Sequence, residues 1–486
     1  MAEGTRPDIY RNPSFRGASE LPKGLGGFKA QLSLGIAAAA VAAIFVTAHW
    51  SIAVVGALIV FALSAAESEL FLLFVVFIIP FGWVLNTDAP IHDVPVAMRF
   101  IVISGFFFGR LWRGQVGARR LLRSPVTRAA LLFLCAVLAP ALLLKGAWTR
   151  SSARSLYEMV SYMGFFFLIL SWTDSAERMQ RILRVLLYST IVTAGFAICQ
   201  EVVGGYTSLW VYLNSPGEDF APWELRAPSF LNYSNSLAGY LNLVLPFALA
   251  CYVLGKGKWK KLGAWAVGLG FIAMLSTQSI GGLVAFACVV VLAIFCFVRV
   301  WGMRLLLLGG ACATAIGFYI AHETLNPSHV GVSVGYDTAT RFMLWDTAWN
   351  LFVQSPIIGI GWGNFVGTYG SYISFIPADV FDVHNLYLQL LAETGIVGFA
   401  AFFVLMYRAT RDAQRQLRST RADLDRALGF GVLGAILTVL VHGNVDFLFR
   451  VSPQFSTLFW MLLALLLASA GLKGRDGPGG ERVVAT

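Results

Sequence analysis

The side chains of this sequence that could do chemistry include one histidine and two arginines, His384, Arg226 and Arg341. An imidazole can remove a proton from a hydroxyl group as a general base. A guanidinium is planar and permanently charged, so it can bind a phosphate through two hydrogen bonds. These residue types make His384 a candidate proton acceptor and the two arginines candidate phosphate-binding groups.

Each of the three also has a purely structural interpretation. His384 could simply hydrogen-bond a loop carbonyl, and an arginine could snorkel or pair with an acid such as Glu224 or Asp346. The place of His384 at the start of an apolar helix adds an expectation. The helix dipole and the first N–H groups of the helix favour the neutral imidazole, which is the form that a base requires.

Three polar residues follow at four-residue spacing on one helix face: Asn385, Gln389 and Glu393. An ionisable group at membrane depth is expected to face the interior of the bundle or a water-filled cavity, because facing lipid is costly. Hydrogen bonding between helices is the alternative to a role in a site.

A second helix face combines Arg341 with Trp345, again four residues apart. Tryptophan at a membrane interface often serves only as an anchor. The glycine-rich stretch that follows, at 357–364, includes Gly361 and Asn364. Its glycines allow the backbone to turn and to approach a ligand closely.

The elements that must position these residues are membrane-spanning helices. Of the 486 residues, 57% are hydrophobic and only 13% are charged, whereas a typical soluble domain has about 25% charged residues. The sequence predicts an all-α polytopic integral membrane protein with about 12–14 transmembrane helices. We place them at roughly 29–48, 51–66, 69–85, 97–112, 128–146, 156–172, 183–203, 232–254, 263–279, 281–298, 304–321, 385–407, 427–443 and 453–471.

The predicted organisation is one membrane domain, 29–471, between the tails 1–28 and 472–486. Lysine and arginine gather on the cytoplasmic side of membrane proteins, and their distribution places both tails in the cytoplasm. Two long loops, 204–231 and 322–384, then lie on the outer face, and the second carries the candidate site. The few Lys and Arg residues left on that face are Arg99, Lys145, Arg150, Arg154, Arg226, Arg341 and Arg450. The net charge of +10 therefore sets orientation and requires no nucleic-acid partner.

Several other classes of site lack support in this sequence. No DxD cluster stands out in an outer loop, and the sequence has no Walker loop and no HExxH motif, which argues against metal-dependent nucleotide-sugar transfer and ATP-driven pumping. The six cysteines form no CxxC pair, so neither a disulfide framework nor a zinc site is expected. We expect neither a metal nor a cofactor.

Taken together, these motifs resemble the O-antigen ligase and polymerase family of bacterial envelope glycan enzymes. The pattern is an Arg, a Trp four residues later, Pro-x-x-Gly-x-Gly-x-x-Asn-Phe, His-Asn and Glu-x-Gly-x-x-Gly. It is carried by Arg341, Trp345, Pro356, Gly359, Gly361, Asn364, Phe365, His384, Asn385, Glu393, Gly395 and Gly398. RAPSFLNYSNSLAGYL resembles the Arg-led segment of the family, and VHGNVDFLFRVSP its closing segment; they supply Arg226, Asn235, His442 and Asp446.

The resemblance implies transfer of a glycan from undecaprenyl diphosphate to an acceptor hydroxyl, at the periplasmic face of the bacterial inner membrane. Arg226 and Arg341 would stabilise the diphosphate leaving group, and His384 would deprotonate the acceptor, without metal. An O-antigen ligase acting on lipid A-core is the first expectation. Supporting residues would be Asn235, Trp345, Gly361, Asn364, Asn385, Gln389 and Glu393.

Other functions stay open. A polymerase of polysaccharide repeat units, or transfer to a protein Ser or Thr, would use the same donor and side chains. A lipid-linked glycan transporter would carry ionisable residues at mid-membrane depth in several spans, whereas the polar residues here collect at one face. A non-catalytic scaffold is a third alternative, because Ile280 replaces an Arg that the family often carries. Ser229 and Tyr233-Ser234 likewise replace a Gly and an Asn-Pro of the Arg-led segment.

Overall fold

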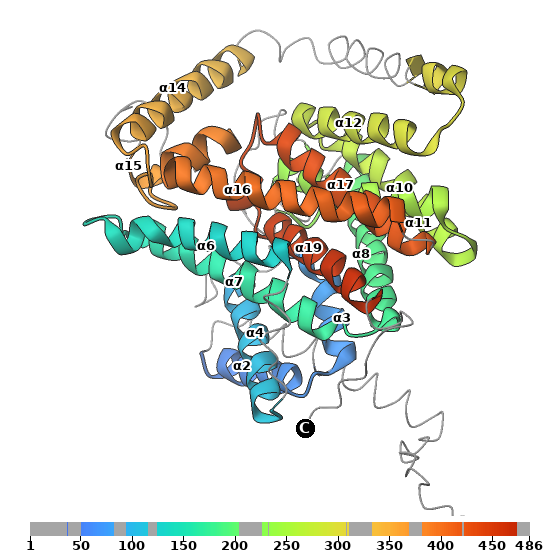
Figure 1. Cartoon of the computed structure of the whole chain (residues 1–486), viewed down its shortest axis with the longest axis horizontal. Coiled ribbons are helices and arrows are strands. Elements are labelled where there is room, and N and C mark those ends of the chain that lie inside the picture. The colour runs from blue at the N-terminus through green and yellow to red at the C-terminus, as the bar shows by residue number, and fades with distance from the viewer. Residues whose placement is uncertain are drawn as a thin grey trace, which may run out of the picture.

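The computed structural model describes residues 36, 50–81, 94–114, 124–203, 226–231, 233–307, 309–310, 333–368, 382–419 and 422–473. These residues form helices and connecting turns, with no strand among them (Figure 1). The all-α prediction is therefore confirmed. In chain order the elements are α2 (Trp50–Ala65), α3 (Glu69–Phe77), the 3-10 helix η1 (Ile79–Phe81), α4 (Val94–Trp112), α6 (Pro125–Leu143), α7 (Arg150–Trp172), α8 (Ala176–Val203), α10 (Ser234–Leu254), α11 (Gly257–Ser276), α12 (Ile280–Phe297), α14 (Ser333–Gln354), α15 (Phe365–Thr368), α16 (Leu386–Ser419), α17 (Asp423–His442), α18 (Leu448–Val451) and α19 (Pro453–Lys473).

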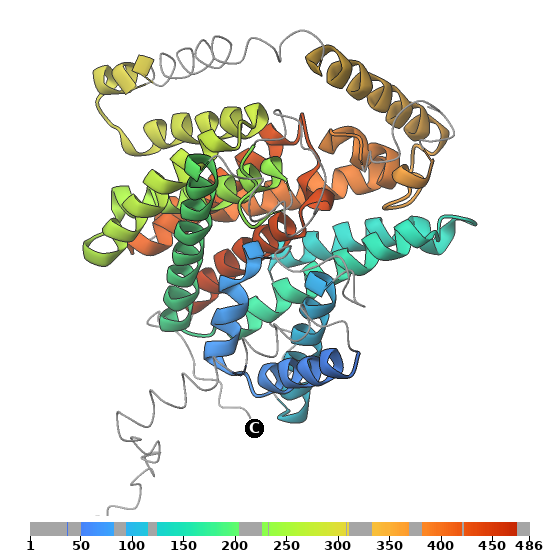
Figure 2. The same ribbon diagram turned by 180° about the vertical axis from the view of Figure 1, so that it is seen from behind.

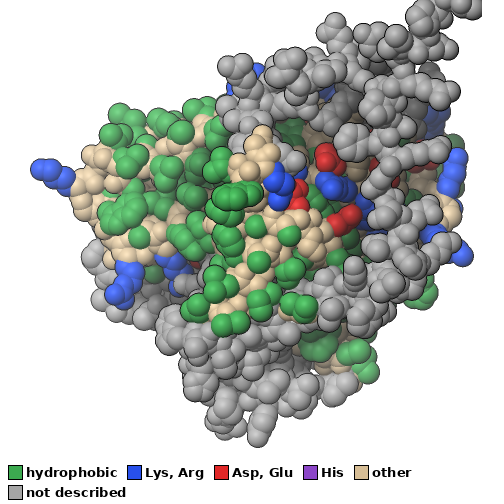
Figure 3. Space-filling model, turned by 90° about the horizontal axis from the view of Figure 1, so that it is seen from below, with side chains coloured by type: hydrophobic (Ala, Val, Ile, Leu, Met, Phe, Trp, Pro, Cys, Tyr) green, Lys and Arg blue, Asp and Glu red, His purple; other side chains and the backbone are tan. Residues whose placement is uncertain are grey.

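Eight of the described helices are long and apolar enough to cross a membrane: α6, α7, α8, α10, α12, α16, α17 and α19. The pair α2 and α3, bent by 118°, would make a ninth. Hydrophobic side chains cover much of the described surface on the face shown in Figure 3. The chain is thus a multi-pass membrane protein. The predicted spans 29–48 and 304–321 lie largely outside the described residues, so the total of about 12–14 stays a prediction.

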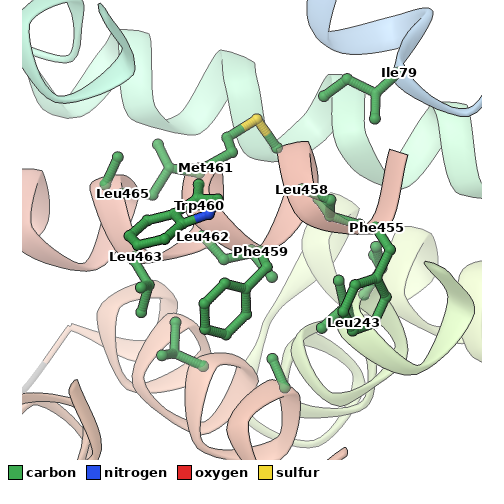
Figure 4. Packing of buried hydrophobic residues seen from close by; sticks show 14 of the residues in the cluster. Ile79, Leu243, Phe455, Leu458, Phe459, Trp460, Met461, Leu462, Leu463 and Leu465 are labelled. Carbon is green, nitrogen blue, oxygen red and sulfur yellow. The ribbon is translucent and has the colours of Figure 1, made fainter. Parts of the chain in front are cut away.

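Helix α19 forms the centre of the bundle. It packs against α7, α10 and α17. Figure 4 shows Phe455, Phe459 and Trp460 of this helix among other apolar side chains, including Leu243 of α10. The α19 sequence is apolar on every side, as expected for a helix surrounded by other helices.

Helix α16 is broken inside its span. Gly395 has φ 61° and ψ −167°, values that end the regular hydrogen bonding of the helix. The glycine-rich stretch pairs with the break. Ile360 N–H donates to Ala392 O at 2.9 Å and Gly361 N–H donates to Glu393 O at 2.9 Å. In return, Ile396 N–H donates to Pro356 O at 2.9 Å. Backbone groups at the break therefore have partners, which a membrane interior demands.

The backbone of the glycine-rich stretch approaches other parts of the protein closely, as its glycines allow. The neighbours are α16 and α7. A Cβ on Gly359 would lie 2.3 Å from the backbone carbon of Glu393, and one on Gly363 would lie 2.4 Å from Ser155 Oγ. Both glycines also have positive φ. Only glycine fits at such a position without strain. The stretch 357–364 is thus a clamp that holds α16 against the start of α7.

Helix α14 lies at the periphery of the bundle, beside α15 and the beginning of α16, in both views of the molecule (Figures 1 and 2). Leu344, Ala348 and Leu351 form the buried stripe of α14, which packs into a small separate apolar cluster with Phe365 and Val383. This packing leaves Arg341 and Trp345 beside the loop that enters α16.

Candidate active site

Four predicted site residues from distant parts of the chain meet at the turn between α17 and α18. Arg226 Nη2 donates to Asn235 Oδ1 at 2.9 Å, and Asn235 Nδ2 donates to Asp446 Oδ2 at 3.0 Å. The other oxygen, Asp446 Oδ1, lies 3.6 Å from His384 Nδ1. Arg341 joins the same turn, because its Nη1 donates to the carbonyl of Val445 at 3.1 Å.

Arg226 is held on two sides before α10 begins. Its Nε donates to the carbonyl of Thr277 at 2.8 Å, which ties it to the turn before α12. Among the described residues no ion pair joins Arg341 to Asp346, and Glu224 lies outside them. The hypothesis that Arg341 merely pairs with Asp346 is therefore wrong. The hypothesis that an arginine pairs with Glu224 is not tested.

His384 lies in a short loop whose backbone is held from several directions. Val383 N–H donates to Gln389 Oε1 at 2.8 Å, and Trp345 Nε1 donates to Val383 O at 3.1 Å. Leu386 N–H donates to the carbonyl of Gly443 at 2.7 Å. His384 itself has φ 52°, in the left-handed region that residues other than glycine seldom adopt.

Asn385 caps helix α16. Its Oδ1 accepts from the N–H groups of Tyr387 and Leu388 at 3.0 Å each, and its Nδ2 donates to Asn444 O at 3.1 Å. A short polar side chain is favoured at such a position because it satisfies N–H groups that have no partner inside the helix. Asn385 and Gln389 therefore shape the loop of His384, and Asn385 also ties this loop to the turn after α17.

Two carboxylates flank the imidazole. Asp382 Oδ1 lies 3.4 Å from His384 Nδ1, and Asp446 Oδ1 lies on the other side. Both carboxylates are buried, while the side chain of His384 is 34% exposed. Because Nδ1 is buried against the two acids, the exposed part of the ring is the part available to a substrate.

The electrostatics of the site follow from these contacts. Burial alone lowers the pKa of His384, but its contact with Asp446 and the charges of Asp382 and Asp446 outweigh burial and raise it. Burial raises the pKa of Asp382 to about 6. Burial also opposes ionisation of Asp446, yet the contact with His384 lowers the pKa of that carboxyl overall. The expectation that His384 favours the neutral form is wrong in direction, because the two nearby carboxylates raise the pKa of its imidazole.

Glu393 belongs to a different network. Arg450 Nη1 donates to Glu393 Oε1 at 3.3 Å and its Nη2 donates to Ser151 Oγ at 3.1 Å. Phe365 N–H donates to the same Glu393 oxygen at 3.0 Å. Glu393 is fully buried, which confirms that it faces the interior of the bundle. This buried ion pair joins α16, α18 and the beginning of α7.

Asn364 is part of the same assembly. Its Nδ2 donates to Ala147 O at 2.8 Å, and Thr149 Oγ1 donates to its Oδ1 at 2.5 Å. Gly361 pairs with α16, as described above. Glu393, Gly361 and Asn364 therefore hold the scaffold, whereas Arg226, Asn235, Arg341 and His384 come together at the site.

The family model described as O-antigen ligase matches residues 265–403. The chain carries an O-antigen ligase domain. A comparison with curated proteins finds no match. The matched segment runs from α11 into α16 and contains Arg341 and His384, while Arg226, Asn235 and Asp446 approach the O-antigen ligase domain from outside it.

Two residues, Asp382 beside His384 and Arg450 beside Glu393, were not assigned a role from sequence. Asp382 stands two positions before His384, a spacing that lets an Asp side chain reach the N–H two residues later, and this was the available signal. Arg450 was recognised only as an outer-face cation. Its partner Glu393 lies 57 residues away, so no local pattern pointed to it.

Ser229 and Ile280, two positions at which the sequence differs from the family pattern, have different surroundings in the structure. Ser229 adopts φ 56°, a glycine-like conformation, and stays there because its N–H donates to Gln200 Oε1 at 2.9 Å and its hydroxyl to Thr193 O at 2.6 Å. Ile280 begins α12 and is 73% exposed. Next to it, a Cβ on Gly281 would lie 2.9 Å from His442 Cδ2. The turn thus reaches the site but places an apolar side chain at its edge.

One group of described residues has the spacing of a metal site. The ligand atoms of Asp382, His384 and Asp446 lie within 4.8 Å of one another. Both oxygens of Asp446, however, already accept hydrogen bonds, from Phe447 N–H at 2.8 Å and from Asn235. Asp382 Oδ1 accepts the His384 N–H. We assign no metal to the three residues, and the expectation of a site without metal stays a prediction.

Proposed function

We propose that this protein transfers a glycan from undecaprenyl diphosphate to an acceptor hydroxyl at the periplasmic face of the bacterial inner membrane, as an O-antigen ligase. The observation that carries the proposal is the meeting of Arg226, Arg341 and His384 at one turn, with the imidazole backed by two carboxylates. The proposal has both termini in the cytoplasm, and the distribution of Lys and Arg supports this orientation.

The proposed reaction is a single displacement. The acceptor oxygen forms a bond to the anomeric carbon of the donor sugar while the bond from that carbon to the diphosphate breaks. The acceptor proton passes to Nε2 of His384, and undecaprenyl diphosphate leaves with the bonding electron pair. Arg226 and Arg341 stabilise the charge that develops on the leaving group.

Fixed cations make this arrangement suitable for a lipid diphosphate. Arg226 is bound to Thr277 O and Asn235, and Arg341 to Val445 O, so both guanidinium groups are ordered before a donor binds. Groups that are ordered in advance stabilise developing charge without reorganising. In this proposal the arginines supply the charge stabilisation and no metal ion takes part.

The acceptor separates the ligase from its alternatives. A lipid A-core acceptor makes the protein a ligase, whereas a growing polysaccharide makes it a polymerase with the same donor chemistry. A lipid-linked glycan transporter is less well supported, because Arg226, Arg341 and His384 gather at one turn and are not spread along several spans.

The test is transfer by the purified protein in liposomes. It receives undecaprenyl-diphosphate oligosaccharide alone, and then together with lipid A-core, each with and without EDTA. The proposal predicts a shifted lipid A-core band that requires the acceptor and survives EDTA. A ladder from the donor alone means polymerase. Donor that crosses the bilayer unchanged means transporter, and activity lost to EDTA and restored by a divalent ion contradicts the metal-free mechanism.

A further inference from the structure

Asp382 contacts His384 twice. Its Oδ1 accepts the backbone N–H of His384 at 2.6 Å and lies 3.4 Å from the ring nitrogen Nδ1 of the same residue. Asp382 is completely buried. One carboxylate therefore controls both the backbone and the ring of the proposed base.

The backbone of His384 needs such support. A left-handed conformation is unfavourable for a residue other than glycine, and it persists only where the surroundings hold it. Here the hydrogen bonds of Val383 fix the loop on one side of His384, and that of Leu386 fixes it on the other. The hydrogen bond to Asp382 is the one that the backbone N–H of His384 itself makes.

The two carboxylates around the imidazole are not equivalent. Asp446 is bound through both oxygens, to Phe447 N–H and to Asn235, and so connects the base with Arg226. Asp382 has a second oxygen, Oδ2, that is buried and has no hydrogen-bond partner. Neither Arg226 nor Arg341 has a described hydrogen bond to Asp382. The contacts of Asp382 with the site are those with His384.

We propose that Asp382 is a positioning residue for His384, which fixes the strained loop and holds Nδ1–H between two carboxylates. This inference rests on the proposed function. When the acceptor proton reaches the other ring nitrogen, Nδ1–H stays between Asp382 and Asp446, and their charges stabilise the imidazolium. No proton leaves Nδ1 in this step. Asp446 links His384 to the donor site, and Asp382 sets the orientation of the His384 ring.

Other charged and titratable groups also influence this cluster. Arg341 of α14 opposes protonation of His384, and His442 of α17 faces Asp446. Arg450 of α18 favours the ionised form of Asp382. A test must therefore change Asp382 while these groups stay in place, and substitution by asparagine does so because the shape of the side chain is kept.

The experiment compares Asp382→Asn, Asp382→Ala and the control Asp346→Asn. An asparagine oxygen still accepts the His384 N–H but carries no charge, whereas alanine loses both contacts. Asp346 lies on the same outer region, is exposed, and binds only Asn350 among the hydrogen bonds described for it. Each full-length protein is purified with ¹³C-labelled histidine, and His384 is titrated by NMR in the presence of EDTA, beside a pH profile of transfer.

We expect Asp382→Asn to lower the pKa of His384 and to reduce the transfer rate about tenfold or more, with donor KM unchanged. The acidic limb of its pH profile moves to lower pH, because a base with a lower pKa becomes neutral at lower pH. Asp382→Ala loses more activity, and Asp346→Asn matches the wild type in all measurements.

An unchanged His384 titration and pH profile in Asp382→Asn would overturn the inference. If the variant does not fold, the wild type still decides, because a His384 pKa at or below that of ordinary imidazole contradicts a carboxylate-held ring. Absence of transfer in the wild type, together with a shifted titration in Asp382→Asn, would refute the proposed function while the Asp382–His384 coupling stands.

Discussion

Asn235 Nδ2 donates a 3.0 Å hydrogen bond to Asp446 Oδ2, across 211 residues of sequence. Asn235 lies in the first turn of α10, and Asp446 lies in the turn after α17. The same asparagine accepts a hydrogen bond from Arg226 through Oδ1. Its amide group therefore holds a cation on one side and a carboxylate on the other. This single side chain connects the proposed donor-binding arginine with the carboxylate beside the proposed base.

Asn235→Ala should therefore reduce transfer without unfolding the protein. Hydrogen bonds to charged groups are worth about 1.5–3 kcal/mol, which corresponds to roughly a tenfold to hundredfold loss in kcat/KM when the bond supports the transition state. Initial rates in liposomes measure the effect. Asn350→Ala, which removes an exposed amide on α14, serves as control. Equal rates for the two variants would show that the amide link is not used.

Arg341→Lys should slow transfer although the charge is kept. A lysine ammonium cannot reproduce the planar fork that reaches the Val445 carbonyl and a phosphate together. We expect kcat/KM to fall by at least about tenfold. Removal of a whole charge-stabilising donor costs about 10² to 10³, and Arg341→Lys keeps part of the interaction. Full turnover by Arg341→Lys, with normal donor KM, would reduce Arg341 to a structural residue.

The rate of transfer should rise with pH through the pKa of His384. The imidazole acts as base only when it is neutral, and the carboxylates raise its pKa. The acidic limb should therefore lie above the pH expected for an ordinary imidazole. Because His384, Asp382 and Asp446 titrate together, the limb reports the cluster and not one residue. A limb below the ordinary range of imidazole would exclude the carboxylate-backed base.

The sequence predicted the residue types of the site better than their partners. His384, Arg226, Arg341 and Asn235 came from chemistry and motif spacing, and the structure brings them together. The protonation preference of His384 was misjudged, because helix-end reasoning is local while Asp446 reaches the ring from 62 positions further along the chain.

The scaffold shows the same limit. Four-residue spacing correctly placed Glu393 on an interior face, but its partner Arg450 comes from another element. The glycines at 357–364 indicated a close backbone approach, and sequence alone could not tell that α16 was the object of that approach. Contacts between distant segments depend on how the helices pack, which residue spacing does not encode.

The clamp on α16 can be tested through stability. Gly359→Ala should destabilise the protein, because φ 71° is unfavourable for alanine and its Cβ would meet the α16 backbone. We expect the thermal unfolding temperature to fall by several degrees. Gly367→Ala is the matched control, since this glycine is in helix α15 with nothing within 4 Å of an added Cβ. Equal unfolding temperatures would show that α16 does not depend on the clamp.

The central claim is that His384 is the base of a glycan transfer reaction, and His384→Asn tests it most directly. The variant is reconstituted with undecaprenyl-diphosphate oligosaccharide and lipid A-core, and donor binding and product formation are measured on the same sample. The account predicts donor binding within about twofold of wild type and a rate lowered by about 10² to 10⁴. Wild-type product formation by His384→Asn would contradict the account.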